Sequence, residues 1–417
     1  MKILSQRQLR RDKGAMKSLT ELYKIGSGPS SSHTMGPEKA ARIFKSENED
    51  ADQFKALIYG SLAKTGKGHM TDKAIIRALS PVRAEVQFVP QADLVLPHPN
   101  TMDFFAYKDG RQTTSMRAVS IGGGDIVIEG QEEMLEPDVY PENSFAEIST
   151  ICKANHIRLS DYVEQCEGKQ IWDFLSGIWE AMKRSIEEGL AATGILEGGL
   201  NVERKAQYLY HQRHMDESQE TRENRIVSAY AFAVNEQNAA AGTIVTSPTC
   251  GASGVVPAAL RYMQEKKQVP DEQVLRALAV GGLIGNLVKQ NASISGAQCG
   301  CQAEVGTACS MASAALAELS GMEIDQIEYA AEVAMEHHLG LTCDPINGLV
   351  QIPCIERNAV GAMRAINALS LAKFLSGTRK ISFDLVIQTM YETGLDMNSR
   401  YRETAEGGLA KLYKMDG

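Results

Sequence analysis

The stretch DFLSGIWEAMKRSIEEGL, residues 173–190, marks where the chain changes character. Its apolar residues recur at helical spacing, and the segments that follow are long and rich in Ala, Leu and Met. Three of them are apolar nearly all round, as deeply buried helices are: VLRALAVGGLIGNLVKQ (274–290), ACSMASAALAELSG (308–321) and AVGAMRAINALSLAKFLSG (359–377). The second half is therefore predicted to be all-helical.

Before this stretch, helical and strand-like pieces alternate. We predict helices at PEKAARIFK (37–45) and TDKAIIRAL (71–79), and strands at RAEVQFVP (83–90) and SIGGGDIVIEG (120–130). This alternation is typical of an α/β layer domain. The predicted fold class is therefore α+β, with an N-terminal α/β layer domain over residues 1–165 and an all-helical domain over residues 166–417.

Length and charge limit the kind of protein this can be. With 417 residues, 43% of them hydrophobic, the chain is long enough for two domains with sizeable cores. The formal net charge is −9 and Lys and Arg form no long run, which argues against nucleic acid or an anionic membrane as a partner. The N-terminal MKILSQRQLRRDKG has only a short apolar run, too short for a signal-peptide core, and no stretch approaches the length of a membrane span, so we expect a cytoplasmic protein of soluble metabolism.

Near the N-terminus, GPSSSHTMGPEKAARIF (28–44) crowds polar side chains between two Gly/Pro pairs. Composition alone favours a solvated Ser-rich linker, but the segment runs straight into a helix, with Gly36 expected as N-cap and Pro37 as first helical residue. Hydroxyls, an imidazole and unpaired backbone N–H groups at a helix N-terminus suit a small anion. We therefore predict a carboxylate or phosphate site here. Two other Gly-rich stretches, TGKGHMT and SIGGGDI, lack the spacing of nucleotide-binding loops and are interpreted as tight turns.

Six of the eight cysteines lie in the second half of the chain. In a reducing compartment each is expected to be a buried thiol, a nucleophile or a metal ligand. Cys301, Cys343 and Cys354 each stand beside a predicted turn or helix end. Their spacings of 42 and 11 residues match neither zinc-ribbon pairs nor a ferredoxin motif. From the residues alone, metal ligation and structural packing both stay open.

Six longer motifs together resemble the iron–sulfur-dependent bacterial L-serine dehydratases: GPSSSHTMGP, TGKGHMTD, HPNTM, NASISGAQCGCQAEVG, MEHHLGLTCDP and QIPCIERNA. The resemblance covers most of the chain. It implies an α/β N-terminal domain, an all-helical catalytic domain, a homodimer and no pyridoxal phosphate. It also implies a [4Fe–4S] cluster on three cysteines, which map to Cys301, Cys343 and Cys354 in this sequence.

The resemblance further implies that L-serine is converted to pyruvate and ammonia. With three thiolates on four irons, one iron stays open and can act as a Lewis acid on the substrate hydroxyl. The residues expected to hold the substrate carboxylate are Ser31, Ser32, His33 and Thr34, with Asn100 and Thr101 as helpers.

We expect the catalytic base to be His69, which would take the Cα proton. His69 stands between Gly68 and a predicted helix start at Thr71 or Asp72. A helix N-terminus lowers the pKa of a histidine and so keeps it neutral, able to accept a proton near pH 7. The alternative is a histidine that only caps its turn.

Three other functions are considered. A related β-substituted amino acid, threonine or cysteine, could use the same iron, because a methyl group changes binding by only about 1–3 kcal/mol. An iron–sulfur sensor would need neither an anion loop nor a base, so both motifs count against it. A pyridoxal phosphate enzyme would need a Schiff-base lysine and a phosphate loop, and the sequence has no such pair. The C-terminal LAKLYKMDG contains no cysteine, so we expect no tail cysteine on the cluster.

Overall fold

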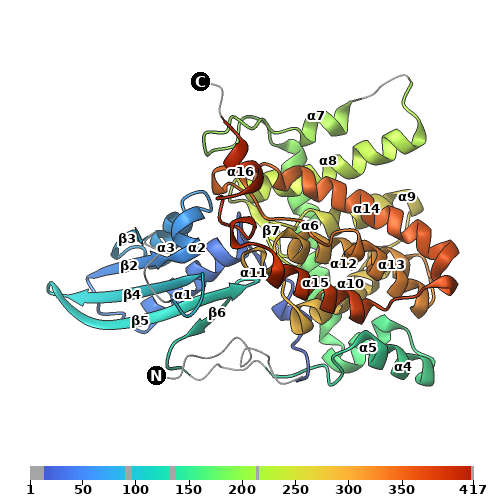
Figure 1. The fold of residues 1–417 in the computed structure, drawn as a ribbon, viewed down its shortest axis with the longest axis horizontal. Coiled ribbons are helices and arrows are strands. Elements are labelled where there is room, and N and C mark those ends of the chain that lie inside the picture. Colours follow the sequence, from blue (N-terminus) through green and yellow to red (C-terminus); the bar gives the residue numbers. More distant parts are fainter. Residues whose placement is uncertain (1–13, 90–95, 132–136, 213–215, 415–417) are drawn as a thin grey trace.

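The computed structural model describes residues 14–89, 96–131, 137–212 and 216–414. A β-sheet with its helices lies on one side of the molecule and a larger body of helices on the other (Figure 1). This is the predicted α+β class. The predicted all-helical second half is wrong at one point, β7 (Thr243–Val245), because this short strand pairs with β1 (Ile25–Ser27) of the N-terminal segment. Pro90 of the predicted strand and the last three residues of the tail without cysteine lie outside the described residues.

The sheet has the strand order β3–β2–β4–β5–β6, with β2 and β3 parallel and the other neighbours antiparallel. Its strands are β2 (Gln53–Tyr59), β3 (Arg83–Val89), β4 (Thr101–Lys108), β5 (Arg111–Gly122) and β6 (Asp125–Ile128). Its helices are α1 (Gly36–Ser46), α2 (Gly60–Thr65) and α3 (Thr71–Leu79). The stretch SIGGGDIVIEG thus contains the end of β5, a glycine turn and all of β6, so the turn interpretation is confirmed and the strand predicted over 120–130 is two strands.

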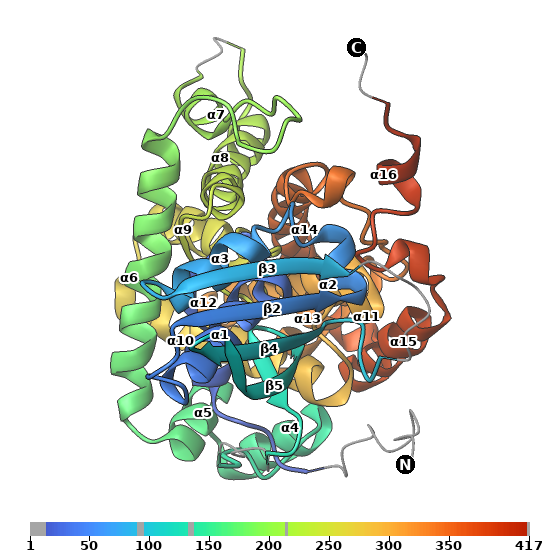
Figure 2. The same ribbon diagram turned by 90° about the vertical axis from the view of Figure 1, so that its left-hand side faces the viewer.

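Alternation along the strands decides which face of the sheet is covered. Phe54 and Ile58 of β2 and Phe104 of β4 are fully buried on the same face, and Phe44 of α1 packs against Phe54 and Phe104. Figure 2 looks onto this sheet from its other side. Parallel strands need a crossover, and α2 and α3 form it between β2 and β3. The turn between these two helices carries His69.

The helical body begins before the boundary predicted at residue 165. Phe145 and Leu159, on the first two helices after the sheet, are fully buried in the same hydrophobic core as the later helices. The longer helices are α4 (Phe145–Asn155), α5 (Leu159–Glu167), α6 (Gln170–Ala191), α8 (Gln219–Ala239), α9 (Val255–Lys267), α10 (Asp271–Asn291), α12 (Thr307–Leu319), α13 (Ile324–Glu336), α14 (Cys354–Leu375) and α15 (Phe383–Asp396). The short ones are α7 (Ala206–His211), α11 (Gly296–Cys299) and α16 (Gly408–Leu412).

Helix α12 forms the centre of this body. Every residue from Thr307 to Leu319 is buried, and α12 contacts α9, α10, α13 and α14. Small side chains allow these helices to approach closely. At another crossing, a Cβ on Gly189 of α6 would lie 2.2 Å from the carbonyl oxygen of Ala233 on α8. The prediction that residues 308–321 form a deeply buried helix is therefore confirmed over the length of α12.

The N-terminal segment positions the loop 28–35 between the sheet and the helical body. Leu19 and Tyr23 are buried in the helical core, and the Tyr23 hydroxyl donates to the Leu278 carbonyl. After β1 pairs with β7, the chain crosses to α1, which covers the sheet. The loop that the sequence singles out therefore lies where the sheet meets the helical body.

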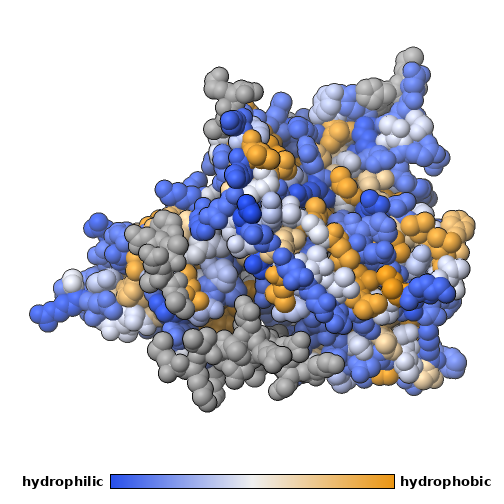
Figure 3. Space-filling model, in the orientation of Figure 1, coloured by the Kyte–Doolittle hydropathy of each residue, from blue (hydrophilic) through white to orange (hydrophobic). Residues whose placement is uncertain are grey.

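Apolar side chains show at the surface more over the helical body than over the sheet (Figure 3). On α14, Phe374 is 82% exposed and Val360 is 61% exposed. Among the described residues, no helix combines the length and the apolar character that crossing a membrane would need.

Candidate active site

The serine-rich loop is the first turn of a helix. Ser30 has an extended backbone and its Oγ accepts a hydrogen bond from the His33 N–H, and Ser31–Met35 then form a π-helical turn that continues into α1. The prediction of Gly36 as N-cap is wrong, because the Gly36 N–H already donates to the Ser31 carbonyl. The open backbone N–H groups of the helix start therefore belong to Ser31 and Ser32, within the loop itself.

All four predicted carboxylate-binding residues of the loop are buried, and they differ in what they already bind. The Thr34 hydroxyl donates to the His69 carbonyl at 2.7 Å and accepts from the Ser30 N–H, so it serves the backbone. Ser32 Oγ lies 2.9 Å from His33 Nδ1. The hydroxyl of Ser31 has no hydrogen-bond partner among the described residues, which leaves it free for a ligand.

The loop is tied to the turn that carries His69, so two separate sequence motifs meet. The Thr71 hydroxyl donates to the His33 carbonyl, and the rings of His33 and His69 lie 4.6 Å apart, centroid to centroid. Burial lowers the pKa of His69 to about 3, and burial together with the charge of His69 lowers that of His33 well below its usual range. The direction agrees with the prediction for His69, but the cause is desolvation rather than the helix terminus.

Glu403 lies against both histidines. Its Oε1 is 3.5 Å from His33 Nδ1 and 3.9 Å from His69 Nε2, and these three buried side chains form a compact cluster. Neither ring nitrogen of His69 has a hydrogen-bond partner in the described part of the chain, and the same holds for Glu403 Oε2. Burial and the charge of Glu304 raise the pKa of Glu403 well above its usual value. Unsatisfied buried groups of this kind are typical of a site that binds a ligand.

The backbone of Glu403 connects the histidines to the cysteines. Its N–H donates to the Cys343 carbonyl at 2.9 Å, and the Cys343 N–H donates to the Tyr401 carbonyl at 2.8 Å. Glu403 has a φ of 57°, a left-handed conformation that is uncommon outside glycine. The sequence analysis missed Glu403, because nothing in RYRETAEGG separates this acidic residue from the many others in the chain.

The structure brings Cys301, Cys343 and Cys354 together from three places in the helical body. Cys301 precedes a π-helical turn (Gln302–Gly306), Cys343 lies in the loop after α13, and Cys354 begins α14. Burial raises the pKa of the Cys343 thiol well above its usual value, and the charges of Glu403, Glu304 and the other two thiols add to this. Charge interactions of this kind act only between groups that lie close together.

Arg357 is the cation beside these thiols. It follows Cys354 by three residues on α14, donates to the Thr342 carbonyl at 2.6 Å and to Asp344 Oδ1 at 2.9 Å, and its charge lowers the pKa of Cys301 against the effect of burial. Because Thr342 and Asp344 flank Cys343, Arg357 holds together the two segments that carry Cys343 and Cys354.

The donor set fits an iron–sulfur cluster. Three thiols that resist ionisation lie near enough for their charges to act on one another, and a bound metal would stabilise them as thiolates. Gly296 lies against this group, since a Cβ there would come within 3.3 Å of Cys343 Sγ. The neighbouring Cys309 belongs elsewhere, because its thiol donates to the Gly361 carbonyl within the helical core.

Asn100 and Thr101 lie at the start of β4, next to the loop. The Thr101 hydroxyl donates to the His98 carbonyl, so it stabilises its own turn. The Asn100 amide donates to the Ser120 carbonyl, and its buried Oδ1 has no partner among the described residues. Their neighbour Pro99 accepts from the Ser61 N–H, and Ser61 Oγ lies 3.2 Å from His33 Nε2. Asn100 is thus better placed than Thr101 to assist a ligand.

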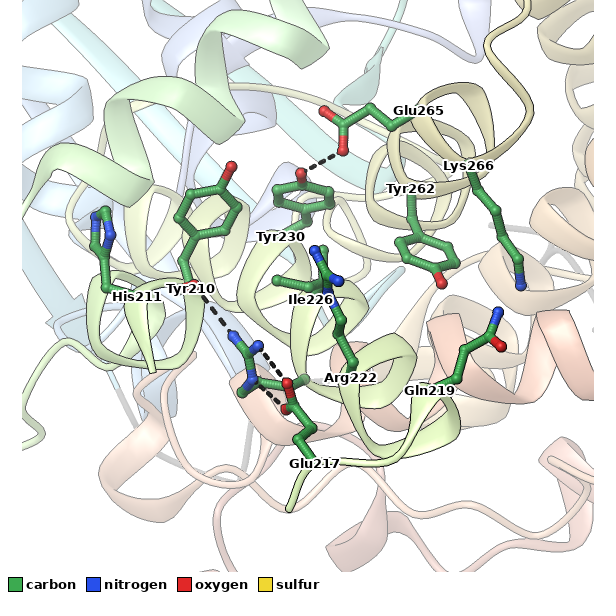
Figure 4. A pocket seen from close by; sticks show the side chains of 11 residues that line it. Tyr210, His211, Glu217, Gln219, Arg222, Ile226, Tyr230, Tyr262, Glu265 and Lys266 are labelled. Carbon is green, nitrogen blue, oxygen red and sulfur yellow. Dashed lines mark hydrogen bonds and ion pairs between the residues drawn. The ribbon is translucent and has the colours of Figure 1, made fainter. Parts of the chain in front are cut away.

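A separate pocket of about 810 Å³ lies between α7, α8 and α9 (Figure 4). Tyrosines and charged side chains line it, and several are paired with one another: the Tyr230 hydroxyl donates to Glu265, and Arg225 binds Glu217 with two hydrogen bonds. It contains none of the residues that the sequence predicts for the site. The predicted residues His69 and Cys343 lie instead where the sheet meets the helices, on either side of Glu403.

Comparisons with known proteins show the family to which the chain belongs. A sequence model of the family described as "Serine dehydratase alpha chain" matches residues 44–410. The chain is 40% identical to L-serine dehydratase 2 of Escherichia coli, over 95% of this chain and 98% of that protein. It is 40% identical to an L-serine dehydratase of Streptomyces coelicolor, over 94% and 98%, and 35% identical to that of Helicobacter pylori, over 95% and 99%.

Proposed function

Because this chain belongs to the serine dehydratase alpha chain family and is of the iron–sulfur type of L-serine dehydratase, we propose that it converts L-serine to pyruvate and ammonia. Water is eliminated to give aminoacrylate, whose imine form then takes up water and releases ammonia. The observation that carries this proposal is the meeting of two groups at Glu403: the buried histidines of the sheet layer on one side and the three cysteines of the helical body on the other. The same meeting point supports an interface site, between the domains predicted at 1–165 and 166–417. The homodimer implied by the resemblance is part of the proposal.

The three cysteines account for departure of the hydroxyl group. Cys301, Cys343 and Cys354 would hold a [4Fe–4S] cluster through three thiolates, and the iron without a thiolate would act as a Lewis acid that helps hydroxide leave. Arg357 supports this arrangement by holding the segments of Cys343 and Cys354 and by placing a positive charge beside the thiols.

His69 is suited to remove the Cα proton. A base must be neutral and must have a free nitrogen, and burial keeps the His69 imidazole neutral while leaving both of its ring nitrogens without a protein partner. The Glu403 carboxyl group, 3.9 Å from Nε2, can stabilise the imidazolium that forms when the proton is taken. The reading of His69 as only a turn cap does not explain why its side chain makes no hydrogen bond with the described residues.

The loop at the start of α1 binds the substrate carboxylate. The backbone N–H groups of Ser31 and Ser32 and the Ser31 hydroxyl lie at the positive end of the helix. His33 is held on both sides, by Ser32 Oγ and by Ser61 Oγ, so its ring has a fixed orientation toward Glu403. Thr34 acts indirectly, since its hydroxyl positions the backbone of His69.

A direct assay tests the proposal. Protein purified without oxygen is given L-serine or L-threonine, and pyruvate, 2-oxobutyrate and ammonia are followed. We expect pyruvate and ammonia in equal amounts from L-serine, at a rate that rises with the iron content of the preparation. Pyruvate formation by iron-free protein at the same rate would contradict the assigned role of the cysteines, and no turnover by iron-loaded protein would contradict the function.

A further inference from the structure

Glu304 is a carboxylate at the cysteine site for which the proposed reaction gives no role. It lies three residues after Cys301, in the π-helical turn before α12. Its Oε1 accepts a hydrogen bond from the Thr249 hydroxyl at 2.8 Å, and its charge raises the pKa of Cys301, Cys343 and Cys354. Glu304 thus lies close to all three proposed ligands.

Two glycines lie beside the Glu304 carboxylate. A Cβ on Gly296 would lie 2.5 Å from Glu304 Oε2 and 3.3 Å from Cys343 Sγ, and a Cβ on Gly251 would lie 3.4 Å from Oε1. Neither glycine has a positive φ, so the backbone does not require glycine at these positions. Because no methyl group stands at Gly296, Glu304 Oε2 and the Cys343 sulfur can both lie against this glycine, and the Glu304 side chain remains partly exposed.

The space around Glu304 has an unbalanced negative charge. In the described part of the chain Glu304 forms no ion pair, and the second nearby carboxyl group, Glu403, has only the two neutral histidines beside it. Two arginines lie nearby: Arg357 is bound to Asp344 and Thr342, and Arg402, whose backbone pairs with Cys343, donates to the Gln298 carbonyl.

L-Serine carries the cation that this arrangement lacks. In the proposed function its carboxylate and its hydroxyl have partners, but its α-ammonium group has none. An ammonium group is a donor of three hydrogen bonds, and a carboxylate that is shielded from water is its strongest natural partner. Glu304 lies close enough to the three cysteines that would hold the metal for its charge to raise the pKa of each thiol.

We propose that Glu304 binds the α-ammonium group of the substrate through Oε2. The inference rests on the proposed function and names a part of it that neither the motifs nor the family comparison assigns. It makes the site specific for amino acids over hydroxy acids of the same shape. Thr249 fixes the carboxylate through Oε1, and Gly251 and Gly296 keep its other oxygen open.

The test compares L-serine with 3-hydroxypropionate, which keeps the carboxylate and the hydroxyl but lacks the amine. Iron-loaded wild type, Glu304→Gln and the surface control Glu272→Gln are assayed without oxygen for KM and kcat with L-serine. Binding of 3-hydroxypropionate is measured by calorimetry, which needs no turnover. Glu304→Gln is expected to raise KM for L-serine on the order of 10- to 100-fold, as loss of a hydrogen bond between charged groups does. Its Kd for 3-hydroxypropionate is expected to stay within about threefold of wild type or to fall, because the added carboxylate then meets less negative charge.

If Glu304 acted in folding or in holding iron, Glu304→Gln would weaken the binding of L-serine and 3-hydroxypropionate alike and would lower the iron content, which is measured for every variant. Either finding overturns the inference. An unchanged KM for L-serine also overturns it. Gly296→Ala provides a second test that retains the charge, since its methyl group would displace Oε2 and should raise KM for L-serine in the same selective way. If wild type neither binds nor converts L-serine, the proposed function itself fails, which is a separate outcome from a wild type that works and a Glu304→Gln variant that works equally well.

Discussion

The pH dependence of the reaction tests the assignment of His69 as the base. Burial lowers its pKa to about 3, and the groups that face its ring are His33, at 4.6 Å, and Glu403, at 3.9 Å. A lowered pKa means that the neutral, active form persists as the pH falls and is lost only near pH 3. At pH 5.5 such a group is about 99% neutral, whereas a histidine with the usual value of 6.5 would be only about 10% neutral.

The difference amounts to about a tenfold change in rate at pH 5.5, which is easily measured. The assay is kcat/KM for L-serine from pH 5.5 to 8, because this ratio reports groups of the free enzyme. We expect a profile without an acid limb near pH 6.5. His69→Gln should lose about 10²- to 10⁴-fold in kcat at every pH, while His211→Gln, in the separate pocket, should retain the wild-type profile.

An acid limb with a pKa near 6.5 that disappears in His69→Gln would refute the claim that burial keeps this histidine neutral. A His69→Gln protein with full turnover and a normal iron content would refute its role as base. Circular dichroism at pH 5.5 checks that the fold is intact, so that loss of structure is not mistaken for protonation of the base.

Three further predictions follow from the same contacts. Cys301→Ser should lose most of its iron, measured by iron and sulfide analysis, whereas Cys166→Ser, whose thiol lies away from the site, should keep it. Gly189→Ala should lower the free energy of unfolding by about 1–3 kcal/mol, because its Cβ would meet a carbonyl oxygen of α8 at 2.2 Å. The control Gly177→Ala, on the same helix, has open space around the added methyl group and should be neutral or stabilising by up to about 1 kcal/mol. Thermal melts measure both variants. In Arg357→Gln the visible absorbance of the iron–sulfur cluster should fade faster in air than in wild type, because the segments of Cys343 and Cys354 lose the hydrogen bonds that join them. An equal rate of fading would contradict this.

Local patterns made the fold largely predictable. The helices at 37–45 and 71–79 and the strand at 83–90 have regular apolar spacing, and their packing follows from it. The predicted boundary near residue 165 falls within α5, although both α4 and α5 pack in the helical core, because amphipathic helices do not reveal which core they will join. The short pairing of β1 with β7 joins segments more than 200 residues apart and leaves no local signal.

In the candidate site too, some residues could be predicted from local sequence patterns and others could not. The serine-rich loop, the His69 turn and the three cysteines carry unusual residue combinations, and family resemblance identifies them from sequence. Glu403 and Glu304 do not stand out, because an isolated glutamate is most often a solvated surface residue. Glu403 reaches Cys343 and the histidines only when the C-terminal segment folds back onto the loop after α13, and Glu304 meets Thr249 and the cysteines only when the helical body assembles. The helix start at Ser31 was missed for a related reason, since the Gly/Pro pair at 36–37 resembles a stronger start signal than the serine that forms the cap.

The central claim is that three cysteines hold a cluster with one iron open to the substrate, across the junction from His69. Mössbauer spectra of protein loaded with iron-57, recorded with and without L-serine, test it most directly. The account predicts one iron distinct from the other three, and a shift in that iron's signal alone when L-serine is added. Four equivalent irons that L-serine leaves unchanged would contradict it.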